Sequence, residues 1–237
     1  MRRDVVVVAI LWVLLTALGW GVVVTFTPFP IAAAAEATIV DDAFTVLTVL
    51  AVPVFTFVVA TLMYSAFRFR SKGIPSEDGP PIRTQRTVVA IWFLITTALT
   101  IVIIVHPGIT GLNELRAHDD ENVDVLVQVE GTRWVWKVAY PQFGVSTRNE
   151  LLLPVGEHVR FDVTARDVLH AFWIPAFRVK IDAVPGIVTT TFATPDKVGD
   201  FDMDANFRLQ CAELCGLGHA RMSIPVRVVE RSEFDEW

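Results

Sequence analysis

The chain's only two cysteines, Cys211 and Cys215, lie in the stretch QCAELCGLGHARMSIP at residues 210–225. His219 and Met222 follow within the same stretch. Soft thiolate and thioether sulfurs together with imidazole form the ligand set that is diagnostic of copper. We therefore expect a metal site in this stretch.

Three kinds of structure compete for the two cysteines. A disulfide is common in an oxidising compartment, but it leaves His219 and Met222 unexplained. A closed zinc site accepts thiolates and imidazoles, but it gains nothing from a thioether. Copper uses the whole set if a second imidazole is available, and His170 in DVLHAFWIP offers one. Two thiolates can bridge two copper ions with one histidine on each, an arrangement that suits fast electron transfer.

Three apolar runs without charge precede this region, at residues 5–26, 43–67 and 87–105. About 20 apolar residues span the roughly 30 Å hydrocarbon core of a bilayer, so each run is long enough to cross a membrane. Pro53 interrupts the second run. Membrane helices tolerate proline where neighbouring groups bond the carbonyl that it leaves free.

Basic residues predict how the chain is oriented. Arg2 and Arg3 precede the first run and further arginines and a lysine occupy residues 68–86, whereas residues 27–42 have neither Lys nor Arg. The positive-inside rule places the N-terminus and the 68–86 loop in the cytoplasm. We expect a multi-pass protein of the plasma (inner) membrane whose C-terminal domain lies on the outer, periplasmic side.

Residues 1–26 have two interpretations, a first transmembrane helix or a signal peptide cleaved near the AEA sequence at residues 35–37. The apolar core is longer than that of a usual signal peptide and ends well before this site, which favours a retained helix. The predicted organisation continues with a transmembrane hairpin at 27–106, including the cytoplasmic loop 68–86, and an extracytoplasmic domain at 107–237.

Alternating short apolar runs in the outer domain predict strands at residues 123–129, 132–140, 158–164, 187–193 and 224–229. Proline and glycine turns separate them, which is typical of an all-β sandwich or barrel. The domain has 13 Lys and Arg against 20 Asp and Glu, a net charge of −7. This charge indicates a solvated surface or a face that attracts a basic partner, and it excludes nucleic acid as a ligand.

The motifs DVLHAFWIP, VKIDAVPG and CAELCGLGHARM, with the W-x-W strand TRWVWKVAY, resemble subunit II of the haem-copper oxidases. The likeness covers nearly the whole chain past residue 40. It implies an α-helical membrane anchor of two or three transmembrane helices, followed by a cupredoxin-like Greek-key sandwich that holds a dinuclear copper centre, CuA. The implied copper ligands are His170, Cys211, Glu213, Cys215, His219 and Met222.

The resemblance also implies roles for three further groups. Glu213 would bind one copper through its backbone carbonyl, while its carboxylate points towards a magnesium ion at the boundary with subunit I. Trp134 matches the aromatic residue at which electrons enter. Asp167 fits either a partner of a metal-bound histidine or an exposed charge that docks the donor.

The function that the resemblance implies is electron transfer from cytochrome c, or a small copper protein, to haem in subunit I, where oxygen is reduced to water. Subunit III is a further expected partner. Quinol-oxidising relatives lack the copper ligands, which disfavours a quinol role. The copper subunit of a nitric oxide reductase is the nearest alternative, and a copper-binding or assembly protein and a zinc-stapled domain are alternatives of other classes.

The chain departs from the family pattern away from the copper ligands. RTQRTVVAIW has no acid where many proton-pumping relatives carry a glutamate. Lys137 and Ala139 stand where several relatives carry an acidic residue after the W-x-W. These differences put proton uptake and donor docking in doubt, not the metal site.

Overall fold

A computed structural model describes residues 2–26, 29–70, 73, 84–119 and 122–237. Most of the expected cytoplasmic loop, residues 71–72 and 74–83, lies outside the described residues. The chain divides into two compact units. One contains residues 1–28 and 42–110, and the other contains residues 29–41 and 111–237.

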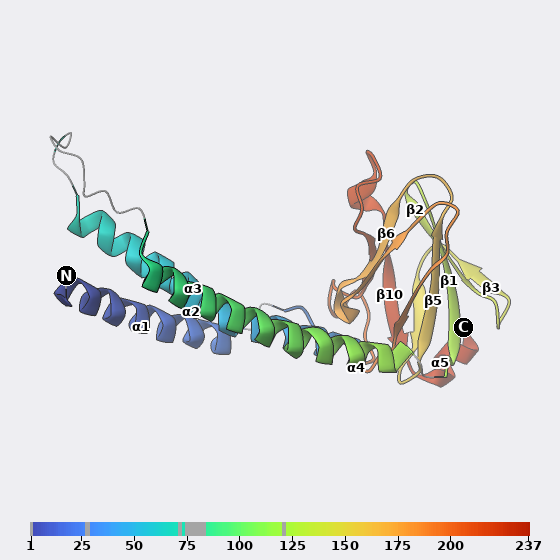
Figure 1. The fold of residues 1–237 in the computed structure, drawn as a ribbon. Coiled ribbons are helices and arrows are strands. Elements are labelled where there is room, and N and C mark those ends of the chain that lie inside the picture. Colours follow the sequence, from blue (N-terminus) through green and yellow to red (C-terminus); the bar gives the residue numbers. More distant parts are fainter. Residues whose placement is uncertain (1, 27–28, 71–72, 74–83, 120–121) are drawn as a thin grey trace. The chain divides into compact units, whose positions relative to one another are not determined.

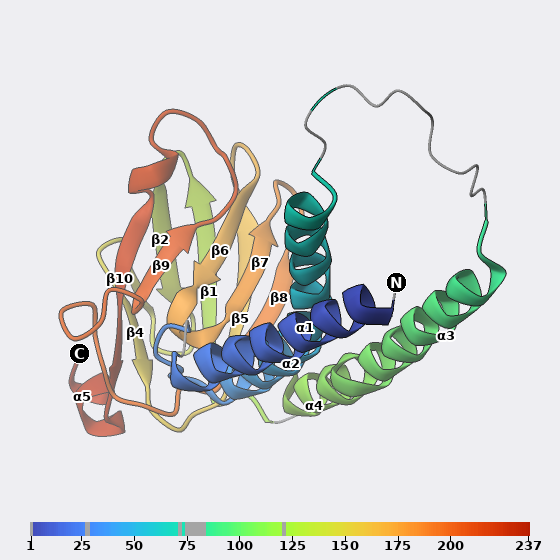
Figure 2. The same ribbon diagram turned by 90° about the vertical axis from the view of Figure 1, so that its left-hand side faces the viewer.

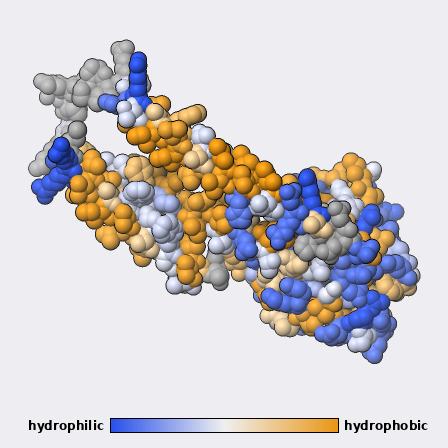
Figure 3. Space-filling model, turned by 60° about the horizontal axis from the view of Figure 1, so that its bottom comes forward, coloured by the Kyte–Doolittle hydropathy of each residue, from blue (hydrophilic) through white to orange (hydrophobic). Residues whose placement is uncertain are grey.

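Each of the three apolar runs forms a helix (Figure 1). They are α1 (Arg2–Thr25), α2 (Ala35–Arg68) and α3 (Arg86–Ile103). All three are long and apolar enough to cross a membrane, the third as part of a span that continues to Ala117. The helices are mostly hydrophobic on the face that Figure 3 shows. The prediction of helical membrane-anchor segments is confirmed.

Polar side chains join α1 to α2 inside their apolar surroundings. Pro53 has no N–H to donate to the carbonyl of Val49 one turn earlier. The indole N–H of Trp20 in α1 donates to that carbonyl at 3.0 Å. The hydroxyls of Thr16 and Thr56 bond across the pair at 2.7 Å and are buried. The freed carbonyl is thus satisfied by a neighbouring helix, as the sequence predicts.

The third helical segment continues further than the apolar run. At His106 the backbone leaves the helical conformation, with φ −140° and ψ 121°, within the turn Ile104–Ile109. A further helix, α4 (Thr110–Asp119), follows. The β-domain therefore begins with a strand only at Val125, after this helix.

The unit that contains residues 111–237 is a sandwich of two sheets (Figure 2), each of five strands. One sheet has the order β3-β2-β1-β5-β8 and the other has the order β4-β10-β9-β6-β7. The strands are β1 (Val125–Thr132), β2 (Val135–Tyr140), β3 (Val145–Thr147), β4 (Leu151–Pro154), β5 (Val159–Ala165), β6 (His170–Ile174), β7 (Val179–Ala183), β8 (Thr189–Ala193), β9 (Arg208–Cys211) and β10 (Ser223–Val229). The expected all-β sandwich is confirmed.

Large side chains fill the space between the two sheets. Trp136, Tyr140, Phe161 and Phe172 are fully buried, and each such aromatic removes about 150–250 Å² from water. β1 pairs in parallel with β5 and antiparallel with β2, so the sheet is mixed. This core supports the segment from Cys211 to Met222, which joins β9 to β10 and is here called the cysteine loop.

Residues 29–41 pack with the sandwich rather than with the helices. Ala33 and Ala34 are fully buried in its core, and Ala34 forms a β-bridge with Pro195. The sequence prediction places this segment in the transmembrane hairpin; the structure groups it with the β-domain.

Candidate metal centre

The cysteine loop is built at one end of the second sheet. His170 is the first residue of β6, and Cys211 is the last residue of β9. These strands pair with Phe172 opposite Cys211, which brings the imidazole beside the thiol. The backbone N–H of Cys211 donates to the carbonyl of Met222 at 2.9 Å and closes the loop that carries Cys215.

The two thiols face each other without a bond between them. Their Sγ atoms are 3.8 Å apart, whereas a disulfide requires about 2.0 Å. Cys211 Sγ lies 3.8 Å from Nδ1 of His170, and Cys215 Sγ lies 3.6 Å from Nδ1 of His219. Each thiol therefore has an imidazole of its own.

Two weaker ligand types complete the group. The thioether sulfur of Met222 lies 3.9 Å from Cys215 Sγ, and the carbonyl oxygen of Glu213 lies 3.2 Å from Cys211 Sγ. The structure thus brings together all six groups expected from the sequence. The ligand atoms of His170, Cys211 and Cys215 lie within 4.8 Å of one another, a group that could hold a metal ion.

Most of the site is shielded from water, and His219 is half-buried. His170 and Met222 are fully buried, and both cysteines are buried. Burial raises the pKa of the Cys215 thiol to about 11, with the neighbouring Cys211 adding to the rise. The Cys215 thiol therefore keeps its proton at neutral pH when no cation is present, and a bound metal would replace that proton.

Asp167 holds His170 from the side away from the thiol. Its Oδ1 accepts the Nε2–H of His170 at 3.0 Å, which leaves Nδ1 free to face Cys211. Its Oδ2 accepts the backbone N–H of Arg133 at 3.0 Å and the Arg133 Nε–H at 2.9 Å. Although desolvation opposes it, hydrogen bonds from Arg133, His170 and Val168 keep the Asp167 pKa well below its usual range. Asp167 is thus a partner of His170.

Trp134 lies directly on the cysteine loop. A Cβ atom added at Gly218 would be 2.3 Å from Cδ2 of the Trp134 ring, so this position accepts only glycine while the ring stays in place. A Cβ at Gly216 would be 3.6 Å from the same ring. Trp134 is 39% exposed. One part of its indole therefore faces solvent, while another part contacts Gly218, the residue before His219.

Two supporting residues were missed by the sequence analysis. A Cβ at Gly131 would lie 3.0 Å from both the His170 ring and the Trp136 ring. The Trp136 and His170 rings themselves meet edge to face, with centroids 6.0 Å apart. A glycine inside an otherwise alternating strand indicates such a close approach, so Gly131 was the available signal.

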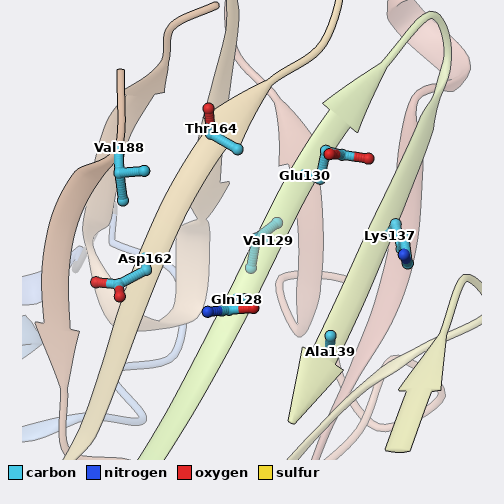
Figure 4. Close-up of a pocket in the computed structure, with 8 residues that line it drawn as sticks. All are labelled: Gln128, Val129, Glu130, Lys137, Ala139, Asp162, Thr164 and Val188. Carbon is cyan, nitrogen blue, oxygen red and sulfur yellow. The ribbon is translucent and has the colours of Figure 1, made fainter. Parts of the chain in front are cut away.

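A separate hollow on the outer face of the first sheet is shown in Figure 4. Its described lining contains neither cysteine nor histidine, and it consists of Gln128, Val129, Glu130, Lys137, Ala139, Asp162, Thr164 and Val188. The exposed Lys137 and the half-buried Glu130 and Asp162 there are typical of a solvated sheet face. The ligand chemistry is thus at the cysteine loop.

Comparison with known proteins agrees with this site. Residues 144–229 match the family model "Cytochrome C oxidase subunit II, periplasmic domain". The heme-copper oxidase subunit 2 of Aeropyrum pernix is 33% identical over 189 residues, which cover 75% of this chain and 79% of that protein. The chain belongs to the subunit II family of haem-copper oxidases.

Other subunit II proteins are similar over part of their length. Cytochrome c oxidase subunit 2 of Alkalihalophilus pseudofirmus is 34% identical over 175 residues, 72% of this chain, but the chain spans only 49% of that relative. The crystal structure of the periplasmic domain of subunit II from Bradyrhizobium japonicum is 38% identical. It covers 49% of this chain and 92% of its own, with a TM-score of 0.45.

Proposed function

We propose that this chain is the copper-bearing subunit II of a respiratory haem-copper oxidase. It receives electrons one at a time from cytochrome c or a small copper protein and passes them to haem in subunit I, where oxygen is reduced to water. Membership of the family supports this proposal. The observation that carries it is the pair of facing thiols, each with an imidazole beside it.

The donor set fits a dinuclear copper centre. Cys211 and Cys215 would hold the two ions between their sulfurs, and His170 and His219, each beside a different sulfur, would each bind one ion. Met222, beside Cys215, and the Glu213 carbonyl, beside Cys211, would be the weak outer ligands, and their distances from the two sulfurs support this role. Copper is the metal that this mixture of donors favours, and the bound pair supplies one-electron redox chemistry. A protein that delivers a single copper ion has no need of two thiol–imidazole pairs.

The chain's own residues keep these donors fixed. Asp167 orients the His170 ring through its Nε2–H, and Gly131 leaves room for that ring beside Trp136. Such outer partners fix the tautomer and the orientation of metal-bound histidines. Because the site is buried and its ligands are held in place, little has to rearrange when its charge changes.

The Glu213 side chain provides a second metal contact in this proposal. Its backbone carbonyl already faces Cys211, so the carboxylate of the same residue is free for a different task. We place it towards a magnesium ion at the boundary with subunit I. Carboxylate oxygen is a ligand that magnesium prefers.

Electrons enter at the Trp134 surface in this proposal. Two apolar side chains that flank Cys215 and Gly216 on this loop are strongly exposed: Leu214 is 80% exposed and Leu217 is 93% exposed. Exposed apolar side chains around a partly buried aromatic are typical of a protein interaction site. A donor docked there lies against the loop that carries His219.

The membrane arrangement is also part of the proposal. α1 is retained, because it satisfies the carbonyl freed by Pro53 and because residues 35–37 are built into the folded β-unit. The chain then crosses the plasma (inner) membrane three times, with the 68–86 connection in the cytoplasm and the sandwich outside. Subunits I and III are its partners within the membrane.

Gas consumption by the purified complex tests the proposed reaction. We expect reduced cytochrome c to support oxygen consumption, and the Cys215→Ser variant to abolish it while subunits I and III still co-purify. Consumption of nitric oxide together with inertness to oxygen would overturn the oxidase assignment in favour of a nitric oxide reductase.

A further inference from the structure

Residues 29–41, here called the strap, lie between α1 and the later turns of α2 and include the first residues of α2. Backbone hydrogen bonds join the strap to the sandwich. The N–H of Ala33 donates to Ala176 at 2.9 Å, and the N–H of Ala35 donates to Thr194 at 3.0 Å. The Glu36 carboxylate in turn accepts the N–H of Thr194 at 3.0 and 3.1 Å. The strap is therefore an ordered part of the β-domain.

One arginine of the sandwich uses all its N–H groups to hold this strap. Arg178 Nε and Nη2 donate to the two carboxylate oxygens of Asp41, each at 2.8 Å. Nη2 also donates to the Pro30 carbonyl at 2.7 Å. Nη1 donates to the carbonyls of Ile31, at 3.1 Å, and Pro175, at 2.6 Å. A guanidinium has five N–H donors, and all five are satisfied here.

The backbone of Arg178 is unusual in a way that agrees with such a role. With φ 59° it is the only non-glycine residue with positive φ among the described residues. This left-handed conformation is unfavourable for a residue with a side chain, and it persists where the surroundings determine it strongly. Four partners of a side chain that is only 10% exposed provide that determination.

Arg178 is joined directly to the metal centre by one short piece of chain. β6 begins with His170 and ends at Ile174, and a single 3-10 turn, η2 (Pro175–Phe177), leads from it to Arg178. The hydrogen bonds of Arg178 to the strap are here called the clamp. Its acidic partner, Asp41, belongs to α2. A strand that carries a metal ligand at one end thus carries the strap's anchor at the other.

We propose that Arg178 is a positioning residue that fixes the metal-bearing sandwich to the strap and to the first turns of α2. The inference deepens the proposed function and rests on it, because the position of the sandwich matters only if electrons leave it for a haem held by another subunit. The clamp itself needs no metal and can be tested without one.

The first test measures hydrogen exchange in the full-length chain in detergent. Arg178→Gly is the informative variant, because glycine adopts φ 59° without strain and only the clamp is lost. We expect the Ala33 and Ala35 amides to exchange faster by on the order of a hundredfold, the size typical of removing one partner of a buried charge pair. Arg227→Ala is the matched control, because it removes ion pairs with Glu150 and Glu233 in the same domain.

The second test measures the rate of electron transfer from the copper site to haem. A residue with only a structural role would not slow this step selectively. In the intact oxidase, a light pulse reduces the donor, and the arrival of the electron at the copper site and at haem is followed optically. We expect Arg178→Gly to slow the second step while the first step and the copper spectrum remain as in the parent. Asp41→Asn should have the same effect, and Arg227→Ala should leave both steps unchanged.

The outcomes separate this inference from the proposed function. Unchanged strap exchange in Arg178→Gly overturns the clamp. Faster exchange with an unchanged rate of electron arrival at haem overturns the positioning role. Absence of copper absorption in the parent protein overturns the proposed function, while the exchange measurement still decides whether the clamp exists.

Discussion

At the residue scale, the chemistry depends on which nitrogen of His170 faces the thiol. Asp167 accepts the Nε2–H and so directs Nδ1 to Cys211. We predict that Asp167→Asn weakens copper binding about 10–100-fold, the usual cost of losing an outer partner of a metal ligand. Competition with a chelator of known copper affinity measures this in the full-length protein.

The matched control for this prediction is Asp162→Asn. Asp162 also pairs with an arginine, Arg160 at 2.8 Å, but it lies on the outer face of the first sheet. Its replacement should leave copper affinity unchanged. Equal affinity in Asp167→Asn and the parent would show that His170 needs no such partner.

A second prediction at this scale concerns the contact between Trp134 and the cysteine loop. Gly218→Ala places a methyl group 2.3 Å from the indole, so the ring must move away. We expect electron uptake from the donor to slow and Trp134 to become more exposed, while copper binding is kept. Stopped-flow reduction by cytochrome c measures the rate.

Gly21→Ala is the control for that substitution, because nothing lies within 4 Å of a Cβ at Gly21. It should leave the reduction rate unchanged. If Gly218→Ala takes up electrons at the parental rate, Trp134 is not the point at which they enter.

At the element scale, α1 and α2 depend on each other through the carbonyl that Pro53 leaves free. Trp20→Phe removes the donor to Val49 and should cost about 1 kcal/mol, a typical size for a hydrogen bond between membrane helices. Pro53→Ala restores an N–H within α2, so the same Trp20→Phe change should then cost nearly nothing. Unfolding in mixed micelles measures this double-mutant cycle, and equal costs in both backgrounds would contradict it.

Tyr140 joins the two sheets at a single backbone position. Its hydroxyl donates to the Leu152 carbonyl at 2.8 Å and accepts the Leu152 N–H at 2.9 Å. Tyr140→Phe leaves these buried groups unpaired, and we expect a loss of about 1–3 kcal/mol of unfolding free energy. Thermal unfolding followed by near-ultraviolet circular dichroism measures it.

The pH dependence of this effect has a definite sign. Burial raises the pKa of Tyr140 well above its ordinary value of 10.0. The folded state therefore holds this proton more tightly, and its contribution is complete below pH 10.0 and decreases as the pH rises above it. The stability difference between the parent and Tyr140→Phe should shrink in that alkaline range. A constant difference would mean that Tyr140 is not the group responsible.

The sequence predicts strands well where one face of the strand is exposed to solvent. β1, β2, β5 and β10 alternate between buried and more accessible residues and were predicted, because alternation requires two unlike faces. β8 was predicted as well, although four of its five residues are half-buried. β4 is buried on both faces, with Leu151–Pro154 all inaccessible, so it has no alternation to detect. β6 and β9 were missed as strands, although the candidate ligands His170 and Cys211 on them were singled out by residue type.

At the scale of the whole molecule, the metal-bearing domain is assembled from two separated parts of the chain. Residues 29–41 resemble a loop or a processing site in sequence, since their alanines have no periodic pattern. Their burial depends on partners more than 130 residues away, such as Arg178 for Asp41. Long-range hydrogen bonds of this kind have no local signature, so only the structure could assign the strap to the sandwich.

The shared dinuclear site is the central claim, and electron paramagnetic resonance of the oxidised, copper-loaded, full-length protein tests it most directly. We predict a hyperfine pattern in which one unpaired electron is shared equally between two copper nuclei, together with two copper ions bound per chain. A pattern from a single copper nucleus, or a protein whose two sulfurs are joined in a disulfide, would contradict it.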